Sequence, residues 1–334
     1  MDENAQMIRF CYGVNGMRRW AFQSSTMTML LVFCPWSPVV NAVLQDDPPI
    51  EATSLLGHPL KRLPLQEDRL AELNEHIDAA RELTNREPDN PDHWVWWGRR
   101  TAYAGRYLES VEVYSNALER FPDSPELLRH RGHRWITLRK FDAAIDDLLR
   151  AAHLIEGKPD KIEPDGIPNA ANQPTSTLKT NTFYHLGLAY YLKGDFESAL
   201  SAYERCWAAC TTNDMRIATI DWMYMTLRRL GRHQEAEQLL ATIDDEWDVL
   251  ENQAYLKRVR LYQRRLDPAE MIGNLGDDIS DIDLATYGYG LGNWFFIEGD
   301  TEQAYAWWQR VIDGRQWAAF GHIAAEAELA RQKK

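Results

Sequence analysis

Large and small side chains recur in this chain at a fixed spacing of 34 residues. The pairs at this spacing are Gly98 with Gly132, Tyr107 with Phe141, Tyr114 with Leu148 and Ala117 with Ala151. Self-similarity at such a period is the signature of a repeat array, in which each unit packs against its neighbours. Small residues let two helices approach closely, and the larger ones fill the space beside them. The period therefore predicts stacked helical hairpins.

The unit from 91 to 124 shows which kind of repeat this is. In chain order it holds Trp94, Trp97, Gly98, Gly105, Tyr107, Tyr114, Ala117 and Pro122. This order resembles the tetratricopeptide repeat, whose pattern is W-x2-L-G followed by an aromatic residue, Ala and Pro. Gly105 is expected to end the first helix in a left-handed conformation, and Pro122 to stop the second. The resemblance implies an all-α solenoid that acts as a binding scaffold.

The resemblance extends over about residues 67 to 330. Later units are marked by Phe183, Leu186, Gly187, Tyr190, Gly194, Phe196, Ala199, Tyr203 and Cys206, then by Gly231, Ala236 and Leu240, and last by Gly292, Gly299, Ala304, Trp308 and Val311. Residues 250 to 272 match poorly and are expected to form a degenerate helical pair. We predict a TPR-like solenoid of about five helix pairs over 67–334, with a capping helix from Trp317 to about Arg331. The RHRGHR, EPDGIPN and YHLGLAYYLKGDFESAL segments also resemble a group of exported bacterial repeat proteins without established activity.

Three segments do not follow the repeat. Residues 1–42 contain the basic Met17-Arg18-Arg19, a short apolar stretch from Met27 to Phe33 and the small-residue signal Val40-Asn41-Ala42, which together predict a cleaved secretory signal peptide. Prolines in 43–66 forbid a continuous helix and indicate an extended arm, whose leucines are expected to pack on the solenoid. A Pro- and Asn-rich insertion at 157–180 is expected to overhang the groove. The mature chain is therefore expected to be exported, as a periplasmic or secreted bacterial protein without a membrane span.

Charge and motifs exclude several function classes. The formal net charge is −13, which argues against binding to nucleic acids or anionic membranes, because these polyanionic partners bind positively charged surfaces. The sequence contains no P-loop, HExxH, GxSxG or paired CxxC motif. Cys206 and Cys210 face the same side of a predicted helix and are interpreted as small core residues. We predict no cofactor, no catalytic residue and no metal ligand, and the sequence does not indicate an oligomeric state.

First-helix positions that point away from the helix-pair core are expected to line a concave groove rich in Arg, His and aromatic residues. The predicted ligand-binding residues are Trp96, Arg99, Tyr103, Arg129, His130, His133, Tyr184, His185, Tyr191, Asp221, Trp222 and Arg228. Guanidinium groups pair with carboxylates and aromatic walls provide contact area, so the predicted partner is a protein or extended peptide with acidic groups. Glycan binding is the alternative ligand. A metal-dependent or hydrolytic enzyme that uses His130, His133 and His185 is the alternative class.

Overall fold

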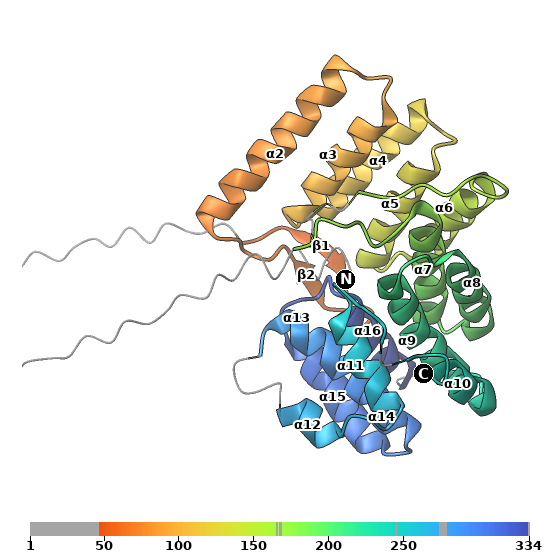
Figure 1. Ribbon diagram of the computed structural model, residues 1–334. Coiled ribbons are helices and arrows are strands. Elements are labelled where there is room, and N and C mark those ends of the chain that lie inside the picture. The colour runs from red at the N-terminus through yellow and green to blue at the C-terminus, as the bar shows by residue number, and fades with distance from the viewer. Residues whose placement is uncertain (1–46, 165, 167–168, 245, 274–278, 333–334) are drawn as a thin grey trace, which may run out of the picture.

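The structure is a computed structural model that describes residues 47–164, 166, 169–244, 246–273 and 279–332, and it is almost entirely helical (Figure 1). The predicted signal peptide lies outside these residues. The elements are β1 (Ile50–Thr53), β2 (Pro59–Lys61), α2 (Glu67–Arg86), α3 (Pro91–Tyr103), α4 (Tyr107–Arg120), α5 (Pro125–Thr137), α6 (Phe141–Leu154), α7 (Leu178–Lys193), α8 (Phe196–Ala209), α9 (Asn213–Arg229), α10 (His233–Leu240), α11 (Gln253–Tyr262), α12 (Pro268–Gly273), α13 (Asp281–Asp283), the π-helix η1 (Leu284–Gly288), α14 (Tyr289–Ile297), α15 (Thr301–Asp313) and α16 (Phe320–Gln332). The predicted all-α solenoid is confirmed.

Close glycine contacts hold the helices of each pair together. A Cβ atom on Gly98 would lie 2.3 Å from the Tyr114 ring, and one on Gly187 would lie 2.6 Å from the Tyr203 ring. Only glycine fits at such positions, so the spacing in the sequence directly reports the packing of α3 on α4 and of α7 on α8. Neighbouring residues also determine where helices begin. The Ser124 hydroxyl accepts a hydrogen bond from Leu127 N and so caps α5, whose first residue is Pro125.

The turn between the helices of a pair needs a left-handed residue, which is usually glycine. Gly105, Gly194, Gly231 and Gly299 have φ angles of 72°, 87°, 72° and 88°. Between α5 and α6 the left-handed residue is Arg139, which has a φ angle of 61°. A non-glycine residue in this region is strained, so its side chain must make contacts that compensate.

Residues 50–61 form a two-stranded antiparallel hairpin rather than a simple extended arm. Leu60 is buried in a cluster with Tyr107, Val111, Leu138 and Trp317. The buried Glu51 pairs with Arg62 and accepts a hydrogen bond from Leu108 N at the start of α4. The hairpin therefore belongs to the core of the first repeats.

The same hairpin contacts the end of the chain. Trp317 Nε1 donates to Lys61 O at 2.7 Å, and Leu55 N donates to Glu326 Oε2 at 3.1 Å. In Figure 1 the hairpin lies between the orange and yellow N-terminal helices and the blue C-terminal ones. The solenoid is thus closed on itself through β1 and β2.

Helix α16 turns back across the array instead of only capping it. Besides α15, it contacts α7, α14 and η1. Arg139 reaches it from the α5–α6 turn and pairs with Glu326 at 2.6 Å, with both side chains 2% exposed. None of the described helices combines the length and apolar composition that a membrane span requires.

Candidate functional site

The predicted groove residues lie together on the inner face, but most of them are covered. Trp96 and Arg228 are partly exposed, and the other ten are buried. Those ten are Arg99, Tyr103, Arg129, His130, His133, Tyr184, His185, Tyr191, Asp221 and Trp222. Two parts of the chain itself, the insertion and the C-terminal helices, contact these side chains.

The insertion covers the inner face of the first two repeats. Arg129 pairs with Glu163 of the insertion at 2.8 Å, and Arg99 Nη1 donates to Pro164 O at 2.9 Å. Arg129 also contacts His130 Nδ1 at 2.8 Å, and Arg99 Nε donates to Tyr103 OH at 3.3 Å. The insertion therefore lies over the groove near His130, and its glutamate meets a groove arginine.

The C-terminal helices cover the inner face further along. The Phe320 ring of α16 packs on His133 and His185, with ring centroids 5.2 Å and 5.6 Å apart. Tyr289 donates to the Tyr191 hydroxyl at 3.0 Å. The rings of Tyr289 and Trp222 stack at 5.7 Å. These groove aromatics are thus part of the protein's core.

A buried ion pair joins α9 to α11. Arg258 Nη2 lies 2.8 Å from Asp221 Oδ2, and these side chains are 1% and 0% exposed. Burial raises the pKa of Asp221 to about 7, an effect that the Arg258 cation only partly offsets. Arg258 lies in the poorly matched segment, so the repeat pattern did not single it out. Arg228, another predicted groove residue, lies near the end of α9, and its Nη1 atom is 3.6 Å from Oε1 of the exposed Glu237.

The three histidines come together only in part. His133 and His185 rings lie 4.3 Å apart, whereas His130 stacks on Tyr114 at 5.9 Å. His185 Nδ1 contacts Asn181 O at 2.6 Å. Within the described residues, no group of three or more His, Cys, Asp or Glu side chains is arranged to hold a metal ion. The arrangement is that of packed core imidazoles.

These imidazoles predict a loss of stability in mild acid. Burial, together with the neighbouring arginines, lowers the pKa of His130 and of His133 well below the usual 6.5. Below pH 6.5 the unfolded chain therefore binds more protons at these two residues than the folded chain does, so their contribution to the free energy of unfolding is expected to fall as the pH drops from about 7.5 to 5, whereas the raised pKa of Asp221 acts in the opposite direction. Urea unfolding at both pH values measures this. A His130→Gln, His133→Gln variant should show a smaller fall, and an equal fall in both proteins would contradict the prediction.

The inner face is more open at Trp96 and Arg100 of α3. The guanidinium groups of Arg99 and Arg100 lie 4.5 Å and 5.1 Å from the centre of the partly exposed Trp96 ring. Arg100 also lies 5.8 Å from the Tyr103 ring. Among the described residues Arg100 has no carboxylate at ion-pair distance. Cations held against aromatic faces in this way can receive an anionic group.

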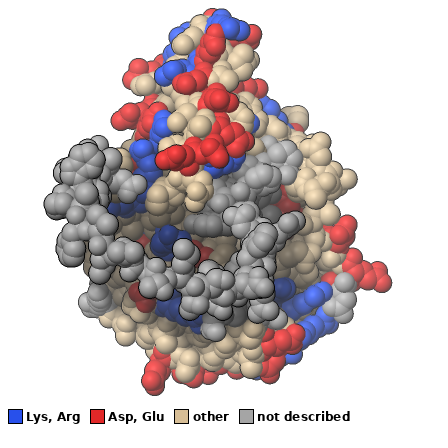
Figure 2. Space-filling model, turned by 90° about the vertical axis from the view of Figure 1, so that its left-hand side faces the viewer, with Lys and Arg blue, Asp and Glu red and all other residues tan. Residues whose placement is uncertain are grey.

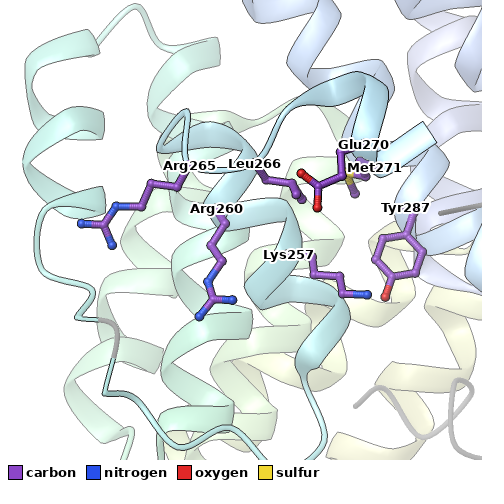
Figure 3. Close-up of a pocket in the computed structure, with 7 residues that line it drawn as sticks. All are labelled: Lys257, Arg260, Arg265, Leu266, Glu270, Met271 and Tyr287. Carbon is purple, nitrogen blue, oxygen red and sulfur yellow. The ribbon is translucent and has the colours of Figure 1, made fainter. Parts of the chain in front are cut away.

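A second candidate site is a pocket of about 330 Å³ formed by α11, α12 and η1 (Figure 3). Its lining residues are Lys257, Arg260, Arg265, Leu266, Glu270, Met271 and Tyr287. Sequence reasoning missed it because residues 250–272 match the repeat poorly. The only signal was a run of basic residues without a matching acidic run.

One segment of the chain matches a known family of repeats. A tetratricopeptide-repeat family model matches residues 180–207, which include most of α7 and α8. Residues 180–207 are a tetratricopeptide repeat. The other helical pairs of this tetratricopeptide-repeat chain follow the same plan, because Gly98, Gly132 and Gly292 contact Tyr114, Leu148 and Trp308 as Gly187 contacts Tyr203.

Several solved structures resemble this one distantly. YrrB, described as a TPR protein with an unusual peptide-binding site, is 15% identical, and the match covers 77% of this chain and all of YrrB with a TM-score of 0.40. A tetratricopeptide repeat protein from Parabacteroides merdae is 15% identical over 73% of this chain and 87% of its own, with a TM-score of 0.44. BtubC from P. vanneervenii is 15% identical over 75% and 90%, with a TM-score of 0.37. No curated protein matches the sequence.

Proposed function

We propose that this tetratricopeptide-repeat chain is a protein-interaction scaffold that binds an acidic segment of a partner protein at Trp96 and Arg100. The binding surface is the N-terminal end of the inner face, where α3 is only partly covered. The observation that carries the proposal is the guanidinium of Arg100, which is held between Trp96 and Tyr103 without a carboxylate at ion-pair distance among the described residues.

The electrostatics of this end favour an anionic ligand. Burial lowers the pKa of Arg100, and the nearby Arg99 and Arg69 act in the same direction. A crowded, partly desolvated cation gains more from a carboxylate than a cation in water does. In Figure 2 one face of the molecule is hollowed, and blue Lys and Arg atoms are visible in its depth where grey atoms do not cover it.

The rest of the inner face supports the same ligand chemistry. Arg129 pairs with Glu163 and Arg229 with Glu328, each within 2.9 Å. Glutamates of the chain itself therefore occupy arginines further along the face. An acidic partner segment would continue this pattern at Arg100.

Photo-crosslinking from position 96 tests the proposal. The full chain carrying a benzophenone amino acid in place of Trp96 is expected to form a discrete crosslinked product in its native cell. An added Arg100→Ala substitution is expected to reduce this product about tenfold, because a charged hydrogen bond contributes about 1.5 to 3 kcal/mol. Mass spectrometry of the product should find the crosslink in an acidic segment.

The matched control is Arg120→Ala, which removes an exposed arginine of α4 paired with Asp89. It should leave the crosslinked product unchanged. Equal loss with Arg100→Ala and Arg120→Ala, or a crosslink in a basic segment, would refute the proposal.

We also propose export of the chain with cleavage after Ala42, which would leave a mature protein that begins with Val43.

A further inference from the structure

The pocket between α11 and α12 lies in the segment that matches the repeat poorly. The second helices α4, α6 and α8 each have 14 residues, whereas the described part of α12 has six. Next to it the π-helix η1 places Tyr287 at the pocket wall. Such π-helical turns are frequent at functional sites.

The floor of the pocket is apolar. Met271 is 2% exposed and belongs to a core cluster with Leu261, Leu284, Leu291 and Trp307. Leu266 is partly buried against the same cluster and also lines the pocket. The floor therefore offers a rigid apolar contact area for a small group.

The rim of the pocket carries cations. Lys257 is exposed, extends toward Tyr287 and lies with its Nζ 5.6 Å from the centre of that ring (Figure 3). Neither Lys257 nor Arg260 has a carboxylate at ion-pair distance among the described residues. The guanidinium groups of Arg260 and Arg265 extend outward from the pocket. The cations Lys257 and Arg260 therefore add positive charge at this rim in a chain of net charge −13.

We propose that this pocket binds a small monocarboxylate with an aliphatic body. The aliphatic body would contact Leu266 and Met271, and the carboxylate would pair with Lys257 beside Tyr287. The volume of about 330 Å³ lies at the lower end of the range for ligand pockets, which fits a small molecule. Glu270 also lines the pocket and would repel a second negative charge, so the ligand is a monoanion.

Binding of two isosteric probes tests this proposal. Saturation-transfer NMR on the full chain at neutral pH would compare 4-methylpentanoate with 4-methylpentanamide. The acid is expected to bind with a Kd on the order of 1 mM, and the neutral amide about tenfold more weakly, because it lacks the charge-assisted contact with the ammonium group. The dicarboxylate glutarate is expected to bind more weakly than the monocarboxylate, because of Glu270.

Variants then locate the site. Lys257→Ala should reduce binding of the acid about tenfold without affecting the amide, and Arg260→Gln should have a smaller effect. The matched control is Lys193→Ala, which removes an exposed lysine of α7 that pairs with Asp142. Equal binding of acid and amide, absence of binding at about 5 mM acid, or binding that survives Lys257→Ala would overturn the proposal. The probe comparison on the unmodified chain does not depend on how any variant folds.

Discussion

Replacing Arg139 with methionine is expected to lower the free energy of unfolding by about 3 to 5 kcal/mol, because the substitution leaves a buried carboxylate without its cation. The guanidinium of Arg139 pairs with Glu326 and also donates to Thr137 O and Trp317 O. Both side chains of the pair are 2% exposed. Urea unfolding followed by circular dichroism measures the effect.

The pH dependence of this pair has a definite sign. Burial raises the pKa of Glu326, but the Arg139 cation and the His322 hydrogen bond outweigh it and set the pKa at about 2, below the usual 4.5. A carboxyl with a lowered pKa in the folded state stabilises it above pH 4.5 and loses that contribution as the pH falls toward 2. The deficit of Arg139→Met relative to the unmodified chain should therefore shrink across this window.

Two further variants distinguish the loss of the Arg139–Glu326 ion pair from a general destabilisation of the fold. Arg120→Met breaks an exposed ion pair whose side chains are 47% and 91% exposed, and it should cost less than about 1 kcal/mol. Removing both charges with Arg139→Met and Glu326→Leu should recover much of the loss, because no buried charge is then left unpaired. If the double variant were less stable than Arg139→Met, the desolvation argument would be wrong.

Replacing Phe320 with alanine is expected to cost about 3 to 5 kcal/mol, as for other fully buried aromatic residues. Phe320 is 2% exposed and contacts the rings of His133, Tyr184 and His185. Its removal should also let water reach the histidines. The His133 pKa, measured by NMR, is therefore expected to rise toward 6.5 from its lowered value.

The control for Phe320 is an apolar residue on the outer surface. Leu149 of α6 is 44% exposed, so Leu149→Ala should change the free energy of unfolding by less than about 1 kcal/mol and leave the histidines untouched. A Phe320→Ala protein with unchanged stability would show that α16 does not seal the inner face.

Local packing could be predicted from the sequence because it is encoded at short range. Gly98 and Tyr114 are sixteen residues apart, as are Gly187 and Tyr203, and each glycine contacts the ring that follows it. The recurrence of such glycines and large side chains every 34 residues gave the helix pairs, their turns and the solenoid. The strained Arg139 could not be predicted, because its partner Glu326 lies 187 residues away.

The burial of most of the predicted groove residues was not predicted from the sequence. Which segments return to cover that face depends on the curvature of the whole array. One local signal did exist in the sequence: residues 181–192 of α7 contain no Asp, Glu, Lys or Arg, and residues 217–227 of α9 contain only Asp221, so neither helix has a charged face. A helix that lacks a polar face is normally enclosed by protein. That signal would have placed Tyr184, Tyr191 and Trp222 in the interior.

The hairpin that joins both ends of the solenoid affects how the molecule unfolds. In an open linear array the terminal repeats can fray while the middle stays folded, because each repeat is held only by its neighbours. Here the Lys61–Trp317 and Leu55–Glu326 hydrogen bonds tie the first repeat to the last helix. Neither end can unfold alone, so the chain should unfold as one cooperative unit. Deleting either end should lower the stability of the opposite end.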